Sequence, residues 1–202
     1  MVKLSLIIPA YNEEKTIENT TKAYVDFLNK KLKNDYEIII IPNGCTDATV
    51  EKVQNLSKNY KQVKYFDLGF PGQKGKAVIK GFELASSDLI GFVDADLSTS
   101  PEAFYDLILN IKDNDGIIAS RALKNSKILT KQSWHRRFSG KSFSFIVNSV
   151  LSLDFYDTQC VAQFFKKEAI KKIYKQIIIS GLAFVINILY LMKLYNFKVI
   201  EI

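Results

Sequence analysis

The sequence is poor in the residues that build covalent or metal-thiolate frameworks. Its 202 residues include two cysteines, Cys45 and Cys160, and neither lies in a recognisable nucleophile motif. Two isolated cysteines predict no disulfide framework and no thiolate metal site, so a reducing compartment is expected. Residues 1–3 lead directly into an apolar run that predicts a strand, which is not the pattern of a secretory signal peptide.

Histidine and long uncharged stretches are also scarce. The single histidine, His135, has no serine or cysteine partner in a recognisable motif, so we interpret it as part of a basic helix. Residues 177–192 carry no charge over 16 positions, which is short of the ~20 needed to span a bilayer. We therefore expect a buried loop and helix there, not a transmembrane span.

Acidic residues are absent between Asp115 and Asp154. This interval holds seven cations, which equal the whole net charge of +7. They are Arg121, Lys124, Lys127, Lys131, Arg136, Arg137 and Lys141. Such a segment favours binding of phosphate groups, in a nucleotide, a nucleic acid or an anionic membrane surface. A solvated basic face is the alternative.

Short apolar runs alternate with amphipathic stretches along the chain. The expected strands are 4–9, 36–41, 63–68, 89–93, 116–120, 158–165 and 198–202. The expected helices are 16–28, 74–85, 101–113, 132–151, 167–175 and the end of 177–192. A further helix is expected through Val50, Val53 and Leu56, and Asp47 can cap it. This alternation predicts a single α/β domain with a largely parallel sheet. Right-handed crossovers then bring the loops after the strands to one edge.

Two carboxylates follow the expected strand 89–93. Asp94 and Asp96 are one residue apart, so in extended chain they point to the same side and repel each other. A hard divalent ion such as Mg²⁺ or Mn²⁺ suits this pair, with diphosphate oxygens and water completing the shell. The alternative is an Asp-rich turn that caps the helix starting near Pro101.

A glycine-rich loop, 69–75, precedes the expected helix 74–85. Its spacing is neither that of a P-loop nor that of a dinucleotide fingerprint. Backbone N–H groups and Lys74 at a helix N-terminus still form a suitable anion site, although a plain turn is equally consistent. Tyr11, Asn43, Lys74 and Asp96 all follow strands or begin helices, so we expect them to converge.

The expected helix 132–151 is amphipathic. Aromatic and aliphatic residues such as Trp134 and Phe145 alternate there with Arg136, Arg137 and Lys141. One interpretation is a surface helix packed on the sheet. The other is a helix at a membrane interface, with its aromatic residues in lipid and its cations at headgroups.

Five short motifs occur in an order and spacing that resemble a known family. They are 7–13 (IIPAYNE), 42–47 (PNGCTD), 72–77 (GQKGKA), 94–98 (DADLS) and 157–160 (DTQC). The chain resembles family 2 glycosyltransferases with the GT-A fold, a Rossmann-like mostly parallel sheet with helices on both faces. Within them it resembles the dolichyl-phosphate (polyprenyl-phosphate) glucosyltransferase and mannose synthase branch.

The resemblance implies roles for particular residues. Pro9, Tyr11, Glu13, Asn43, Lys74 and Asp94 would bind the nucleotide sugar. Asp94 and Asp96 would hold Mg²⁺ or Mn²⁺. Arg121, Arg136, Arg137 and Ser139 would hold the phosphate of the acceptor and, with Asp96, form the catalytic set. Residues 1–100 would be the nucleotide-sugar-binding half and residues 101–202 the acceptor-binding half of one domain.

The implied reaction is inverting, metal-dependent transfer of a hexose from a donor of the UDP-glucose or GDP-mannose type to a polyprenyl or dolichyl phosphate. The enzyme would be cytoplasmic and peripheral at a membrane face. An alternative is a family 2 enzyme with a soluble glycan or protein acceptor. Val185 and Asn187 stand where the family has carboxylates, so a degenerate nucleotide-sugar-binding module is another alternative. We expect no nucleic-acid binding.

Overall fold

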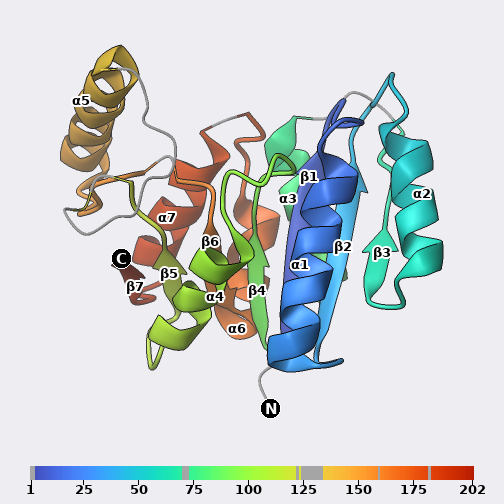
Figure 1. The fold of residues 1–202 in the computed structure, drawn as a ribbon. Helices are drawn as coiled ribbons and strands as arrows, with labels where there is room; N and C mark the ends of the chain where they lie inside the picture. Colours follow the sequence, from blue (N-terminus) through green and yellow to red (C-terminus); the bar gives the residue numbers. More distant parts are fainter. Residues whose placement is uncertain (1–2, 70–72, 122, 124–133, 159, 182) are drawn as a thin grey trace.

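The protein folds around one seven-stranded sheet. The computed structural model describes residues 3–69, 73–121, 123, 134–158, 160–181 and 183–202, with only the backbone for residues 134–139 and 141. The strand order is β3-β2-β1-β4-β6-β5-β7. Strands from both halves of the chain therefore share a single sheet (Figure 1).

The elements alternate along the chain as βαβ units. The strands are β1 (Leu4–Ala10), β2 (Tyr36–Pro42), β3 (Val63–Tyr65), β4 (Leu89–Phe92), β5 (Gly116–Ile118), β6 (Gln163–Lys166) and β7 (Val199–Glu201). The α-helices are α1 (Ile17–Leu32), α2 (Thr49–Asn59), α3 (Lys74–Leu84), α4 (Pro101–Asn110), α5 (Trp134–Leu151), α6 (Lys167–Ile173) and α7 (Phe184–Leu194), and a 3₁₀ turn, η1 (Tyr174–Gln176), follows α6.

The sheet is parallel except at β6. This strand runs antiparallel to β4 and to β5, with Phe92 opposite Gln163 and Ile118 also opposite Gln163. Because β6 is reversed, its first residue lies at the same edge as the last residues of the other strands. The segment that precedes β6 is therefore brought to the carboxyl edge of the sheet.

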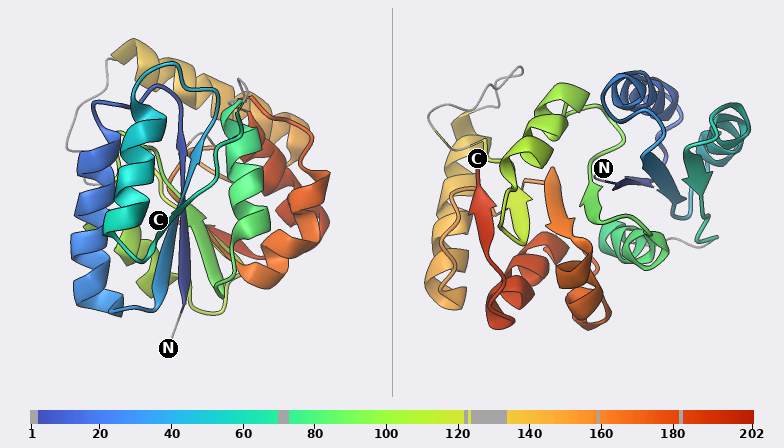
Figure 2. Two further views of the ribbon diagram at one scale, coloured as in Figure 1. Left: turned by 90° about the vertical axis from the view of Figure 1, so that its right-hand side faces the viewer. Right: turned by 90° about the horizontal axis from the view of Figure 1, so that it is seen from below.

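Apolar side chains cover both faces of the sheet. Leu6 and Ile8 of β1 pack with α1, α2 and α4, whereas Ile7 packs with α3, α6 and α7. Side chains alternate along a strand, so an unbroken apolar run is buried only when both faces are covered. Figure 2 shows the two helical layers on either side of the sheet.

The elements expected from the sequence are present, with shifted ends. The strand expected at 158–165 begins only at Gln163, and the helix expected at 132–151 is α5, which begins at Trp134. The expectation of a buried loop before α7 is wrong for Ile178 and Ile179, which are exposed, whereas α7 itself is buried as expected. In the part of the chain that the structure describes, no helix combines the length and apolarity needed to cross a bilayer.

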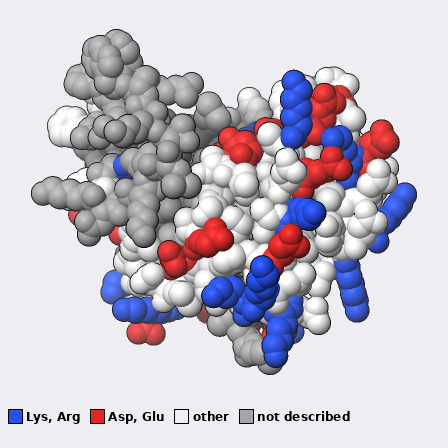
Figure 3. All heavy atoms as spheres, in the orientation of Figure 1, with Lys and Arg blue, Asp and Glu red and all other residues white. Residues whose placement is uncertain are grey.

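Charges of both signs are mixed on the surface of α1 and α2. Figure 3 shows acidic and basic side chains interspersed on this side of the molecule. Lys52 of α2, for example, pairs with Glu18 of α1 at 2.5 Å. This mixture agrees with the sequence, in which the residues outside 116–153 carry equal numbers of basic and acidic side chains.

A buried carboxylate joins three strands at the amino edge of the sheet. Glu37 of β2 accepts hydrogen bonds from Ser5 Oγ (2.5 Å), Ser86 N (3.0 Å), Ser86 Oγ (2.9 Å) and Lys64 Nζ (2.8 Å). Burial alone would raise the pKa of Glu37, but the hydrogen bonds from Lys64, Ser5 and Ser86 outweigh it and lower the pKa below its ordinary value.

Replacing this carboxylate should weaken the fold. Glu37→Gln keeps the shape but turns an amide N–H₂ toward groups that donate, so the free energy of unfolding in urea should fall by about 1–3 kcal/mol at pH 7. Because the folded pKa is lowered, the carboxylate stabilises the protein above its unfolded pKa and loses this effect as the pH falls through the folded pKa. The difference between wild type and variant should therefore shrink below about pH 4.

Lys64→Met is the matched control, because it removes only the exposed partner of Glu37 and should cost less than about 1 kcal/mol. A Glu37→Gln variant as stable as wild type at pH 7 would contradict this assignment.

Candidate active site at the carboxyl edge of the sheet

The segment after β4 is held from behind by α1. Thr20 Oγ1 donates to the carbonyl oxygen of Ala95 (2.7 Å), and the Tyr24 hydroxyl donates to that of Thr99 (2.9 Å). Thr20 and Tyr24 are four residues apart and so share one face of α1. These contacts fix the backbone that carries Asp94 and Asp96 without touching either carboxylate.

A tight turn follows the second carboxylate. Asp96 Oδ1 accepts the N–H of Ser98 at 2.9 Å, and Leu97 between them has a φ of 58°. Ser100 then caps α4 by accepting the N–H of Ala103 at 3.2 Å, with Pro101 in the first turn. The expected Asp-rich turn before α4 therefore exists, but the cap is Ser100 and neither Asp94 nor Asp96 takes that position.

The ends of β1 and β2 form the next wall of the site. The buried Asn43 donates from its backbone N–H and from Nδ2 to the carbonyl oxygen of Ala10, each at 3.0 Å. Its side chain thereby ties the two strand ends together. Glu13 is positioned by its backbone N–H, which donates to Thr49 Oγ1 at 2.7 Å, and by Thr16 Oγ1, which donates to its carboxylate at 2.5 Å.

The capping expected at Asp47 differs in detail. The carboxylate accepts the N–H of Thr49 (3.0 Å) and of Glu14 (3.1 Å), although the residue next to α2 is Ala48. Burial opposes the charge on Asp47, but the hydrogen bonds from Thr49 and Glu14 prevail and lower its pKa. Asp47 thus joins the loop after β1 to the start of α2.

The N-terminus of α3 supplies the cation of the site. Lys74 is the first residue of α3, and its Nζ is hydrogen-bonded and ion-paired to Asp94 Oδ1. The next residue, Gly75, donates its N–H to the carbonyl oxygen of Ser180 at 2.9 Å. A Cβ at Gly75 would lie 2.8 Å from that oxygen and 2.8 Å from the Cβ of Phe184, so glycine permits this close approach.

These walls enclose a cavity of about 330 Å³. It is lined by Pro9, Tyr11, Glu13, Asn43, Lys74, Asp94, Ala95 and Asp96. The lining includes every residue that the sequence analysis assigned to the nucleotide sugar or to the metal. The structure therefore brings these residues together, and their ligands remain predictions.

The carboxylate oxygens of the cavity suit a divalent ion whose remaining ligands are phosphate oxygens and water. Asp94 and Asp96 offer hard carboxylate oxygens, which Mg²⁺ and Mn²⁺ prefer. Among the described residues, no group of three or more His, Cys, Asp or Glu side chains is clustered to hold a metal. Two carboxylates fit an ion that takes its other ligands from diphosphate and water. Lys74 compensates the charge of Asp94 through their ion pair.

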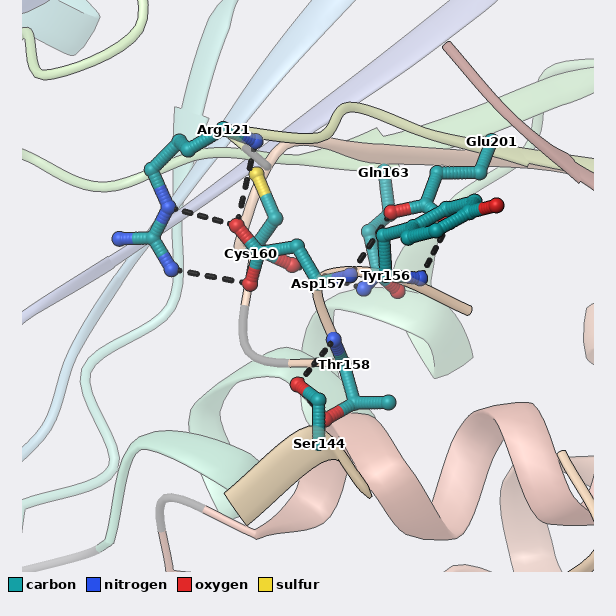
Figure 4. A network of polar contacts seen from close by, with 8 residues as sticks. All are labelled: Arg121, Ser144, Tyr156, Asp157, Thr158, Cys160, Gln163 and Glu201. Carbon is teal, nitrogen blue, oxygen red and sulfur yellow. Dashed lines mark hydrogen bonds and ion pairs between the residues drawn. The ribbon is translucent and has the colours of Figure 1, made fainter. Parts of the chain in front are cut away.

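A bidentate ion pair lies beyond β5. Asp157 Oδ2 accepts from Arg121 Nε (2.7 Å), and Oδ1 accepts from Arg121 Nη2 (3.0 Å), as Figure 4 shows. The Asp157 hydrogen bond is the main cause that raises the pKa of Arg121, and Asp94 adds to the same shift. Arg121 thus has a carboxylate partner that was not expected from the sequence, and its role toward an acceptor phosphate remains a prediction.

Two further contacts hold the segment that carries Asp157. Glu201 accepts the backbone N–H of Tyr156 (2.6 Å) and of Asp157 (2.8 Å). The hydroxyls of Thr158 and Ser144 lie 3.1 Å apart, which ties the segment to α5. Figure 4 shows these contacts on both sides of Asp157.

Cysteine chemistry is not favoured next to this segment. Burial, followed by the nearby Asp157, raises the pKa of Cys160 to about 12. The thiol therefore stays protonated at neutral pH and is a poor nucleophile. This agrees with the sequence, in which neither cysteine lies in a nucleophile motif.

Three predicted acceptor residues lie outside the described side chains. Arg136, Arg137 and Ser139 belong to the backbone of α5, but the structure does not describe their side chains. Thr20 and Tyr24, which support the backbone of the site, were not expected from the sequence. Their spacing on one helix face was the available signal, but their partners are 75 residues away in the chain.

The family model for Glycosyl transferase family 2 matches residues 5–174. The chain belongs to this family. It is 32% identical over 213 residues to the dolichyl-phosphate beta-glucosyltransferase of Dictyostelium discoideum, covering 100% of this chain and 65% of that protein. It is 38% identical over 128 residues to the dolichol-phosphate mannosyltransferase of Pyrococcus furiosus, covering 63% of this chain and 35% of that protein. The chain thus spans less than two thirds of the length of these family 2 relatives.

Solved structures support the same fold. A mannosyltransferase from Pyrobaculum calidifontis, in complex with GDP-Man and Mn²⁺, aligns with a TM-score of 0.66 at 13% identity, over 100% of this chain and 55% of that chain. Glucosyl-3-phosphoglycerate synthase from Mycobacterium tuberculosis, with Mn²⁺, UDP and phosphoglyceric acid, aligns with a TM-score of 0.69 at 16% identity, over 99% and 68%. The α/β GT-A fold expected for a family 2 member is confirmed.

The positions that depart from the family pattern have a structural role in this chain. Val185 is buried among the apolar residues of α7 and its neighbours. Asn187 Oδ1 accepts the N–H of Ile178 (2.9 Å) and of Ile179 (3.1 Å). Asn187 therefore holds the loop that continues to Ser180, the residue that contacts Gly75 and so supports the helix end that carries Lys74.

The close approach at Gly75 gives a prediction. Gly75→Ala should lower the free energy of unfolding by about 1–3 kcal/mol, because the new Cβ overlaps Ser180 and Phe184. Helix propensity alone would make the alanine variant more stable by about 1 kcal/mol. A lower free energy of unfolding in urea would therefore show that the overlap of the new Cβ with Ser180 and Phe184 destabilises the variant.

Gly181→Ala is the control. Its Cβ would meet only Gln73 Oε1, at 3.8 Å, so its stability should stay within about 0.5 kcal/mol of wild type. Equal effects of the two substitutions would show that the contact with Ser180 and Phe184 is not what destabilises Gly75→Ala.

Proposed function

We propose that this chain transfers a hexose from a nucleotide sugar of the UDP-glucose or GDP-mannose type to a polyprenyl or dolichyl phosphate, with inversion. The observation that carries the proposal is the cavity at the carboxyl edge, where Lys74 and two carboxylates meet the ends of β1 and β2. Ligands of α/β sheets bind at this edge. The names of two relatives, a dolichyl-phosphate beta-glucosyltransferase and a dolichol-phosphate mannosyltransferase, support the choice of acceptor.

The donor would leave as a nucleoside diphosphate, so negative charge develops on its leaving oxygen. Asp94 and Asp96 would hold Mg²⁺ or Mn²⁺, which when bound stabilises that charge. Lys74 would turn from Asp94 to the diphosphate and add a second positive charge. Asn43 and Tyr11 would face the nucleotide, and Pro9 and Glu13 complete the wall.

The acceptor needs little activation. A phosphate is already anionic, so one of its oxygens attacks the anomeric carbon while the bond from that carbon to the diphosphate oxygen breaks. A single displacement inverts the configuration. Arg121, held by Asp157, would orient the phosphate and offset the repulsion from Asp94, together with Arg136, Arg137 and Ser139 of α5. The two halves, 1–100 and 101–202, would then serve donor and acceptor respectively.

A lipid acceptor implies work at a membrane surface. We propose a peripheral location at the cytoplasmic face, supported by the basic segment 116–153. The second candidate is a nucleotide-sugar-binding module without turnover. The observation that favours it is the buried Val185 and the structural Asn187, neither of which offers a carboxylate to the site.

Donor binding tests the proposal. Calorimetric titration of UDP-glucose and GDP-mannose, with and without Mn²⁺, should show metal-dependent binding of one donor, followed by product formation with a polyprenyl phosphate. Asp96→Ala should weaken donor binding in Mn²⁺ by at least about tenfold, because it removes a direct metal ligand, and loss of even an outer-shell partner typically costs about 10–100-fold in metal affinity. Binding without product would favour the binding module, and no binding would refute both.

The control for that variant is Asp113→Ala, at the opposite edge between α4 and β5, which should leave donor affinity unchanged. Unchanged donor affinity in Asp96→Ala would refute the metal assignment.

The ion pair of Lys74 gives a separate prediction. Lys74→Met removes the positive charge beside Asp94, so the donor-free protein should bind Mn²⁺ about threefold to tenfold more tightly. The same change should weaken donor binding, since the diphosphate loses a cation. Mn²⁺ titration followed by electron paramagnetic resonance measures the first effect without any turnover.

Lys76→Met provides the comparison, because Lys76 is an exposed cation on the same helix end and should have little effect on either affinity. Equal Mn²⁺ affinity in wild type and Lys74→Met would argue against competition between the lysine and the metal.

A further inference from the structure

The segment that carries Asp157 lies outside the helices and strands. Residues 152–158 form neither kind of element. The backbone N–H and C=O groups of such a segment are not paired in a ladder, so contacts with side chains set its position. Only 9% of the Asp157 side chain is exposed. Whatever fixes the backbone of this segment therefore also fixes the Asp157 carboxylate.

Glu201 of β7 holds the backbone of this segment. Its Oε2 accepts the N–H of Tyr156 at 2.6 Å and its Oε1 accepts the N–H of Asp157 at 2.8 Å, as Figure 4 shows. Two consecutive N–H groups thus converge on one carboxylate, and hydrogen bonds to a charged acceptor are about twice as strong as those between neutral groups. Glu201 itself is fixed because β7 pairs with β5, where Glu201 lies opposite Ile118.

Asp157 in turn orients Arg121. Its carboxylate accepts from the backbone N–H of Arg121 at 3.2 Å, from Nε at 2.7 Å and from Nη2 at 3.0 Å. One carboxylate therefore sets both the backbone and the side chain of Arg121. The remaining nitrogen, Nη1, points away from Asp157 in Figure 4, and no described residue accepts from it. The outer edge of the guanidinium, formed by Nη1 and Nη2, suits two oxygens of a second anion.

Arg121 leaves the sheet at the level of the carboxylates that follow β4. Phe92 of β4 and Ile118 of β5 both lie opposite Gln163 of β6. The two strands therefore end at one height on either side of β6, roughly 10 Å apart, since neighbouring strands are about 4.8 Å apart. Asp94 follows the first strand and Arg121 the second. A phosphate at the outer edge of Arg121 would thus lie beside the cavity, not against its carboxylates.

We propose that Glu201 is a positioning residue for the acceptor phosphate. It holds Asp157 through two backbone N–H groups, and Asp157 orients the guanidinium that would receive the phosphate. Residue 201 lies beyond residues 5–174, which match the family model, so that match assigns it no role. The acceptor phosphate rests on the proposed function, whereas the control of Arg121 by Glu201 does not.

The other end of β7 provides a matched control for a purely structural role. Asp115 Oδ2 accepts the N–H of Lys198 at 2.8 Å, so this carboxylate also ties the β7 segment to the sheet. Asp115 precedes β5, whereas Arg121 follows it, so the two residues lie at opposite edges. Asp115→Ala should therefore loosen β7 without reaching Arg121.

The first test follows the guanidinium by NMR. The chain contains three arginines, so protein labelled with ¹⁵N-arginine gives three Nε–H signals, and Arg121→Lys identifies the signal of Arg121. In Glu201→Ala this N–H should exchange with water at least about tenfold faster than in wild type, because its bond to Asp157 opens more often. In Asp115→Ala the exchange should be as in wild type. Glu201→Gln keeps one acceptor oxygen, so its effect should be smaller, and it replaces Glu201→Ala if that variant does not fold.

The second test separates the acceptor from the donor. With a polyprenyl phosphate, Glu201→Ala should raise the KM for the acceptor about tenfold to a hundredfold, because Arg121 no longer presents its outer edge in one orientation. Donor affinity, measured by calorimetry in Mn²⁺, should be unchanged, because the residues that line the cavity lie on or next to β1, β2, β4 and α3. A mere loss of folded protein would lower kcat and leave both quantities unchanged.

Three results would overturn the proposal: unchanged exchange of the Arg121 Nε–H in the Glu201 variants, equal acceleration in Asp115→Ala, or equal losses of acceptor KM and donor affinity. Failure of the proposed function has a different signature. Faster exchange in Glu201→Ala without product formation by wild type would refute the proposed function and leave the control of Arg121 intact. Product formation by wild type with unchanged exchange in Glu201→Ala would refute the positioning role alone.

Discussion

The repulsion between two carboxylates at the end of a buried strand is the constraint on which the site depends. Asp94 and Asp96 lie on a backbone segment that Thr20 and Tyr24 of α1 hold through the carbonyl oxygens of Ala95 and Thr99. The pair needs a neighbouring positive charge, and Lys74 supplies one through its ion pair with Asp94. Any anionic ligand must overcome the same repulsion.

The residues that line the cavity can be predicted from the sequence, because the strand topology alone places them at one edge of the sheet. The run of Leu6, Ile7 and Ile8 is buried on both faces, which requires helices on both sides of a mostly parallel sheet. In such a sheet the residues after the strands share an edge whatever the details of packing. Asn43 and Asp96 each follow a strand, so their convergence needs no knowledge of tertiary contacts.

The supports of the site could not be predicted in this way. Asp157 binds Arg121 from 36 residues away, and Asn187 holds a loop whose Ser180 contacts Gly75 across more than a hundred residues. Each contact depends on which loops meet after the sheet has formed. In the sequence, Asn187 is notable only because the family has a carboxylate at this position. In the structure its amide oxygen accepts hydrogen bonds from two backbone N–H groups. Composition and spacing contain no signal for such a role.

The two sides of the site are stabilised by different interactions. The cavity rests on strand ends and on α1, which are part of the apolar core, whereas Arg121 depends on Asp157 and on a polar connection to α5 through Thr158. Hydrogen bonds exchange with water at small net cost, but apolar packing does not. The geometry around Asp94 is therefore held by the apolar core, whereas the geometry around Arg121 depends on polar contacts that compete with water.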